Sequence, residues 1–332
     1  MGIISSPVTT SNYEIPAILF EINHNNIDAP ILSKDKAVLI EDLLREWKFE
    51  ECLKAKGITP RNTILIYGPS GCGKTHLASY IAKSLHLRLF AIRFDSLISS
   101  YLGETGNNIR KAFEFILANR CVLFIDEMDA IAKRRDDQNE LGELKRIVIT
   151  LLQNLDTKEN KSILIAATNH PHMLDPAIWR RFEFILELLP PKSTDRMNLF
   201  SFYLGQQIPD SIKEDLIFST DGFTGSDILQ ICNNAKRKFF INNHVNLLLD
   251  LSLSILDYLK RIPLNEPPKK LDEKKLTAAL CIKKLDGESF SFHELEDLSG
   301  IPHSTLHNRY KQLQGVRNNG RSFKAAFENT SA

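Results

Sequence analysis

The sequence has no long apolar run, no clustered cysteines and no excess of charge of either sign. No segment reaches the roughly 18 uninterrupted apolar residues of a membrane-spanning helix, so we expect no membrane partner. The five cysteines are odd in number, widely spaced and without a Cys-x-x-Cys pair. This pattern disfavours a disulfide framework and a zinc site. We therefore expect a protein of the reducing cytoplasm.

Charge is nearly balanced along the chain. Its 42 basic side chains face 41 acidic ones among 332 residues, so bulk charge predicts neither a nucleic-acid nor a membrane partner. Any such binding site must be local. At roughly 150 residues per domain, the length predicts about two domains, with room for a small third.

Between residues 38 and 190 the sequence alternates between helical and strand patterns. Alternation of this kind builds a mostly parallel sheet with helices on both faces, so we predict an α/β fold. The predicted strands cover 64–67, 87–94, 121–126, 162–168 and a short segment near 182–188, and the predicted helices cover 36–55, 74–85, 106–118 and 141–155.

The pattern changes on either side of this region. Residues 1–37 are expected to be an arm or linker with room for one strand, and residues 191–262 a small helical domain. A proline-rich break at 263–270 then separates residues 263–332, which we expect to be a helical C-terminal segment.

The segment GPSGCGKT, from Gly68 to Thr75, fits the phosphate-loop pattern G-x-x-x-x-G-K-[ST] between a predicted strand and a predicted helix. Main-chain N–H groups of such a loop cradle phosphates, the lysine reaches the β and γ oxygens, and the hydroxyl ligates magnesium. We expect ATP and Mg²⁺ as cofactors. The predicted nucleotide contacts are Gly68, Pro69, Ser70, Gly71, Cys72, Gly73, Lys74, Thr75 and His76.

A pair of carboxylates, Asp126 and Glu127, follows the apolar strand pattern CVLFI. In an open α/β sheet, ligands bind at the carboxyl ends of the strands. There Asp126 would hold magnesium together with Thr75, and Glu127 would orient and polarise the attacking water. The alternative is that the two acids merely end a strand or begin a helix.

Three more polar residues follow the next predicted strand. Asn169 falls at the same sheet edge, where its amide could orient the water, although a turn-forming asparagine is an alternative. Arg180 and Arg181 lie eleven residues further on. Guanidinium groups stabilise charge on a transferring phosphoryl group, but two ordinary surface arginines would give the same pattern.

In this order, GPSGCGKT, LFIDE, AATN, LDPAIWRRF and DGFTGSDI resemble the motifs of the AAA family of ring-forming ATPases, over about residues 38–262. The adjacent arginines are most similar to the katanin, spastin and ESCRT-disassembling branch. The resemblance implies a P-loop NTPase (AAA+) sheet domain with a helical lid. It also implies that Asn169 is a sensor and that Arg180 and Arg181 act in trans on ATP bound by a neighbouring subunit.

Two further matches extend the resemblance. SSYLGETGNNIRKAF is similar to the first pore loop and following helix of AAA proteins, which implies that Tyr101 and Leu102 line a central channel. Gly103 and Glu104 favour a loop there, although Tyr101 could be a core aromatic. Gly225 and Ser226 would approach the adenine from the start of a lid helix; family members usually have alanine at Ser226.

The C-terminal segment resembles a helix-turn-helix around Gly300, with residues 304–313 as its second helix. Glu296 departs from the pattern, because such motifs prefer a small residue there. Glu328 is the one acidic residue among the final 32, which also contain several basic side chains. Duplex DNA is therefore a possible partner of residues 285–332. The alternative is a structural hairpin. These basic residues are Arg309, Lys311, Arg317, Arg321 and Lys324.

The motifs together favour an ATPase, most simply a homohexamer that remodels, unfolds or disassembles an unidentified protein client through its pore. One rival is a DNA-associated ATPase, a loader or regulator, that binds duplex through the C-terminal segment. Another rival is a nucleotide switch with little turnover, which the presence of Glu127 and Asn169 disfavours.

Overall fold

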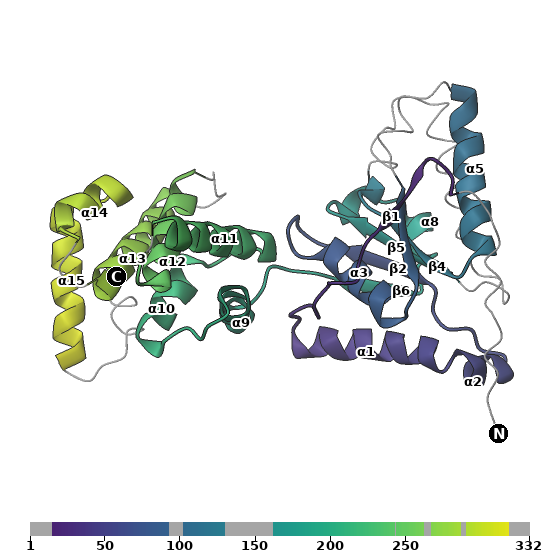
Figure 1. Ribbon diagram of the computed structural model, residues 1–332, viewed down its shortest axis with the longest axis horizontal. Helices are drawn as coiled ribbons and strands as arrows, with labels where there is room; N and C mark the ends of the chain where they lie inside the picture. Colours follow the sequence, from purple (N-terminus) through teal and green to yellow (C-terminus); the bar gives the residue numbers. More distant parts are fainter. Residues whose placement is uncertain are drawn as a thin grey trace. The chain divides into compact units, whose positions relative to one another are not determined.

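The computed structural model of the chain describes residues 15–92, 102–129, 162–242, 244–261, 267–286 and 290–318. The chain folds into two compact units, Met1–Leu189 and Pro190–Ala332. The first contains the sheet and the second is helical (Figure 1). Within the described residues, no helix combines the length and apolar character needed to cross a membrane.

The first unit is built on a six-stranded sheet with the order β1-β3-β4-β5-β2-β6. All neighbouring strands are parallel except β1, which pairs antiparallel with β3. This mostly parallel sheet confirms the predicted α/β fold. The strands are β1 (Leu19–Ile22), β2 (Thr63–Tyr67), β3 (Arg88–Ile92), β4 (Cys121–Ile125), β5 (Ile163–Thr168) and β6 (Phe184–Glu187).

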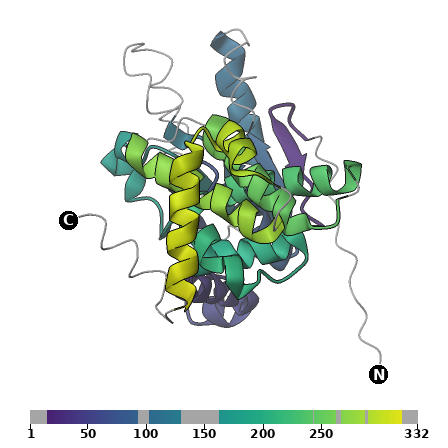
Figure 2. The same cartoon turned by 90° about the vertical axis from the view of Figure 1, so that its left-hand side faces the viewer.

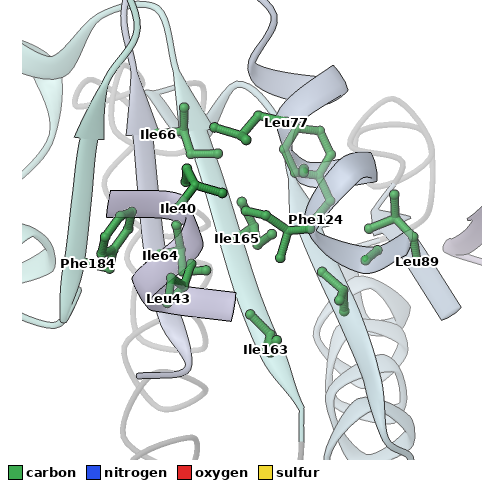
Figure 3. Close-up of a cluster of buried hydrophobic side chains, with 14 of the residues drawn as sticks. Ile40, Leu43, Ile64, Ile66, Leu77, Leu89, Phe124, Ile163, Ile165 and Phe184 are labelled. Atoms are coloured by element: carbon green, nitrogen blue, oxygen red, sulfur yellow. The ribbon is translucent and has the colours of Figure 1, made fainter. Parts of the chain in front are cut away.

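The central strands are continuous apolar runs because helices cover both faces of the sheet. On one face, Ile64 of β2 and Ile165 of β5 pack with α1 (Lys34–Lys48) and α3 (Lys74–Ser84) (Figure 3). On the other face, Leu65 and Leu164 pack with α5 (Leu102–Ala118). Successive side chains therefore enter opposite cores.

Two elements differ from their predicted bounds. The helix expected at 36–55 is interrupted at Phe49, and α2 (Glu50–Ala55) follows. Beside the interruption, the buried Glu50 carboxylate contacts the partly exposed Lys54 at 2.6 Å and the exposed Arg120 at 2.8 Å. The second difference is α5, which begins at Leu102 rather than near 106. The helix expected at 141–155 lies outside the described residues.

The strand in the N-terminal segment belongs to the sheet itself. Residues Leu19–Ile22 pair with Ile92–Leu89 at the sheet edge, and Ile18 and Leu19 are buried in the core. The described part of 1–37 therefore supplies the one strand expected there, and its apolar side chains pack beside β3.

The second unit is a bundle in which α13 packs against α10 and α12. Helix α13, which follows the proline-rich break, consequently belongs to the same compact unit as the preceding helices. Lys284 on α13 forms an ion pair of 2.5 Å with Asp215 on α10. The helices are α9 (Ser193–Leu204), α10 (Asp210–Ser219), α11 (Gly225–Ile241), α12 (Leu247–Arg261), α13 (Pro268–Asp286), α14 (Phe292–Ser299) and α15 (His303–Asn318).

Candidate functional site

The glycine-rich loop joins the carboxyl end of β2 to α3, and its backbone depends on three glycines. Gly68, Gly71 and Gly73 have φ angles of 142°, 78° and 92°, a region that other residues rarely adopt. At Gly68 a Cβ atom would also lie 1.9 Å from the carbonyl oxygen of Leu188. The chain therefore turns tightly beside β6, and a loop of this kind exposes N–H groups to an anion.

Lys74 begins α3 and turns its ammonium back into the loop. Its Nζ donates to the carbonyl oxygens of Gly68 at 2.8 Å and Pro69 at 2.9 Å, and to Oδ1 of Asn169 at 2.5 Å. Burial lowers the pKa of Lys74, although the charge of Asp126 partly opposes this shift. Parallel pairing of Tyr67 with Thr168 explains why Asn169 reaches the loop.

Asp126 and Glu127 follow the last residue of β4, beside the loop. Asp126 Oδ2 accepts a 3.3 Å hydrogen bond from Thr75 Oγ1, and its Oδ1 accepts a 2.9 Å bond from the Glu127 N–H. Glu127 is exposed and has a φ of 50°, an uncommon conformation that in proteins concentrates at functional sites. A hydroxyl and a carboxylate at this separation are oxygen donors that suit Mg²⁺.

A buried pair that the sequence analysis missed joins β4 to β5. Asp129 Oδ1 accepts a 2.8 Å hydrogen bond from Thr168 Oγ1, which in turn accepts a 3.0 Å bond from the His170 N–H. These bonds flank Asn169 and fix the chain on both sides of it. The available signal was a third carboxylate three residues after Asp126.

The main chain of Arg181 lies away from the loop of its own chain. Arg180 ends the short helix α8 (Pro176–Trp179) and is exposed. The carbonyl oxygen of Arg181 accepts a 3.0 Å bond from Thr63 Oγ1. Thr63 begins β2, whereas the loop follows the other end of that strand, about 13 Å away at 3.3 Å per residue.

The remaining predicted residues have varied surroundings. His76 Nε2 lies 3.0 Å from the carbonyl oxygen of Asp28, so the N-terminal segment lies against α3. Tyr101 lies outside the described residues. Leu102 is the first residue of α5, so the expectation of a loop at Gly103 and Glu104 is wrong.

Gly225 and Ser226 are the first two residues of α11 in the helical unit. The preceding Thr224 and the following Asp227 form a reciprocal capping box, with Thr224 N donating to Asp227 at 2.8 Å. This cap fixes where α11 begins, and it leaves the predicted adenine contact as an expectation.

Comparison with known proteins agrees with this geometry. Residues 64–189 match the sequence model of the "ATPase family associated with various cellular activities (AAA)". The chain is 38% identical over 224 residues to the AAA family ATPase y4kL of Sinorhizobium fredii, covering 67% of each protein. It is 33% identical over 229 residues to a cell division cycle protein 48 homolog of Archaeoglobus fulgidus, of which it covers 30%.

The fold has a solved counterpart in the crystal structure of the FIGL-1 AAA domain. The TM-score is 0.59, the match covers 81% of this chain and 92% of that domain, and the identity is 22%. The likeness at this identity concerns the fold.

Proposed function

Because this chain is an ATPase of the AAA family, we propose that it hydrolyses ATP to ADP and phosphate as a homohexameric ring. We propose further that the ring uses this cycle to remodel, unfold or disassemble a protein client through its central pore. The observation that carries the ring proposal is the position of Arg181 at the amino end of β2, away from the loop of its own chain.

The residues around the loop have complementary roles in this proposal. The Lys74 ammonium binds the β- and γ-phosphate oxygens, and the loop N–H groups surround the phosphates. Asn169, which lies 2.5 Å from Lys74, orients the attacking water. The exposed Glu127 polarises that water as a general base. The γ-phosphate therefore meets cation, amide and base at one sheet edge.

Thr75 and Asp126 are the residues that would hold Mg²⁺, because their oxygens already lie 3.3 Å apart. When bound, the ion neutralises negative charge on the β- and γ-phosphate oxygens. The N–H of Glu127 donates to the other oxygen of Asp126. This bond orients the carboxylate and leaves Oδ2 directed to Thr75.

Arg180 and Arg181 complete the site of a neighbouring subunit in this proposal. The exposed Arg180 follows the four-residue helix α8, whose N-terminus is capped by Asp175 at 2.8 Å from the Ala177 N–H. A short, capped helix is a suitable support for a guanidinium that must reach a phosphoryl group on another chain. Tyr101 and Leu102 would then face the pore and grip the client.

Mixing two inactive variants tests the shared site. Arg180→Ala,Arg181→Ala should bind ATP but lose about 10³-fold in turnover, and Lys74→Ala should lose nucleotide binding. Mixed under ring-forming conditions, the two should regain measurable phosphate release, because intact loops then meet intact arginines. Arg110→Ala, at an exposed arginine of α5, is the matched control and should retain full activity. A mixture no more active than its parents, in rings verified by sedimentation, contradicts action in trans.

A further inference from the structure

Helices α14 and α15 are joined by the three-residue turn Gly300, Ile301 and Pro302. Gly300 has φ 72° and ψ 11°, and its N–H donates to the Glu296 carbonyl at 2.7 Å. A short turn containing glycine is the connection of a helix-turn-helix. In both Figure 1 and Figure 2, α15 runs along the outside of the helical unit and α14 crosses one end of it.

The two helices are held in a fixed relation. Leu295 of α14 and Leu306 of α15 are fully buried, and the Phe292 ring contacts His307 at 5.1 Å. Glu296 Oε2 accepts from the His303 N–H at 3.1 Å and lies 2.8 Å from its ring Nδ1. The residue that departs from the sequence pattern thus caps the second helix.

The exposed face of α15 is polar and contains no apolar side chain in the described part. Ser304, Asn308 and Lys311 follow one another at helical spacing, with Thr305 and Gln312 beside them, and all five are exposed. The apolar residues Leu306 and Leu313 are buried. No aspartate or glutamate occurs anywhere between residues 303 and 318. The helix therefore offers hydroxyls, amides and positive charge without a carboxylate.

We propose that α15 is a recognition helix that enters the major groove of duplex DNA. Asparagine and glutamine can pair with adenine edges, and serine and threonine with several bases, while the Lys311 ammonium would contact a phosphate. The major groove admits an α-helix, and the 16 residues of α15 span about 24 Å. A protein partner would instead favour an apolar centre at the interface, which this face lacks.

The acidic residues of the two helices are confined to α14, and this determines which helix faces the DNA. Glu294 belongs to a capping box with Ser291, Glu296 contacts His303, and Asp297 is exposed. These carboxylates repel phosphates, so the duplex meets the motif through α15. DNA binding through α15 depends on neither ATP hydrolysis nor the pore. A failure of DNA binding would therefore leave the proposed function standing, and the reverse also holds.

A salt titration with the full-length protein tests the charge contact. Binding of a fluorescent 30-base-pair duplex, measured by anisotropy in ATP and Mg²⁺, should weaken steeply with salt. Lys311→Ala should reduce the log–log slope by about 0.9. The matched control Lys213→Ala removes a lysine of α10 that contacts Asp210 at 3.7 Å, and it should leave the slope unchanged. Absence of binding at about 50 mM salt, or equal effects of both variants, overturns the proposal.

A second measurement distinguishes groove recognition from general attraction to polyanions. Selection from a randomised duplex pool should return a preferred sequence, and Asn308→Ala should reduce discrimination at one base position by about tenfold. Duplex RNA should bind more weakly, because its major groove is too narrow for side chains to read. If polyglutamate or RNA binds equally well with the same dependence on Lys311, α15 is a general polyanion or acidic-protein surface and the DNA proposal is wrong.

Discussion

Lys74 connects two parts of the site that are 95 positions apart in the sequence, the glycine-rich loop and Asn169. Its side chain is buried, and its ammonium is satisfied by three oxygens. Phosphate oxygens must compete with these three acceptors for the hydrogen bonds that the Lys74 ammonium donates. Removing the ammonium and removing the base should therefore have different consequences.

We expect Lys74→Ala to abolish nucleotide binding, because no other cation in the described part of the loop can replace the ammonium. Glu127→Gln should retain binding but lower turnover by about 10²-fold or more, since it removes only the carboxylate that we propose as the general base. Fluorescent nucleotide titration and phosphate release measure the two quantities. Near-wild-type turnover in both variants would refute the assignment of this site.

Cys72 provides a chemical test of the same loop. It is half-buried between Gly71 and Gly73, whereas Cys52 on α2 is exposed and the other three cysteines are buried. We expect thiol alkylation to inactivate the enzyme, because an adduct at Cys72 occupies the space of the phosphates, and we expect ATP to protect it. Cys52→Ala is the control and should leave this sensitivity intact. An active Cys72→Ala enzyme that remains equally sensitive contradicts the explanation.

At the scale of elements, the close approach of the loop to β6 constrains the first unit. Gly68 allows the chain to pass directly beside the Leu188 carbonyl. A Cβ atom at this position would lie 1.9 Å from the carbonyl oxygen, which is a steric clash. Gly57 after α2 has a similarly positive φ of 76° but open space around it. Substitution of Gly57 therefore measures the cost of backbone strain alone, whereas substitution of Gly68 adds a steric clash.

Gly68→Ala should destabilise the first unit by about 1–3 kcal/mol or more through overpacking, in addition to backbone strain. Gly57→Ala should cost about 1–2 kcal/mol, the strain alone. Both tryptophans, Trp47 and Trp179, lie in this unit, so their fluorescence during urea unfolding measures both variants. Equal losses of stability would contradict the steric argument.

The sequence predicts the central strands well, because β2, β4 and β5 are apolar runs that flanking turns delimit. It also predicts that the ends of β2, β4 and β5 meet, which brings Lys74, Asp126 and Asn169 together. The interruption at Phe49 is not predictable from periodicity, because the apolar pattern runs on through it, and the contact between Glu50 and Arg120 joins segments that are distant in the sequence. The packing of α13 on α10 and the Asp129–Thr168 bond are likewise contacts between distant segments.

At the scale of the whole molecule, the proposed activity requires work on a client as well as hydrolysis. The site chemistry resides in the first unit, and Tyr101 precedes α5 in the same unit. Gripping a polypeptide and cleaving ATP are thus assigned to different residues, which makes them separable by substitution.

Tyr101→Ala should keep basal ATP hydrolysis within a few-fold of wild type but abolish its stimulation by unfolded polypeptide, because the role we propose for this side chain is to grip the client and not to take part in the chemistry. Phosphate release with and without an unfolded protein measures both quantities. The parallel variant Tyr80→Phe, on α3, should change neither. Loss of nucleotide binding in Tyr101→Ala would indicate a core tyrosine instead.

The antiparallel strand β1 also determines how this protein can be shortened. A fragment starting at residue 38 would retain all the nucleotide-loop residues but remove the antiparallel partner of β3, leaving β3 paired with β4 alone. The main-chain groups of β3, next to the apolar side chains of Leu89 and Ala91, would then be open to strands from other molecules, which is a common origin of aggregation. Fragments intended for crystallisation or for kinetic work should therefore begin before Ile18, so that this border of the sheet stays covered.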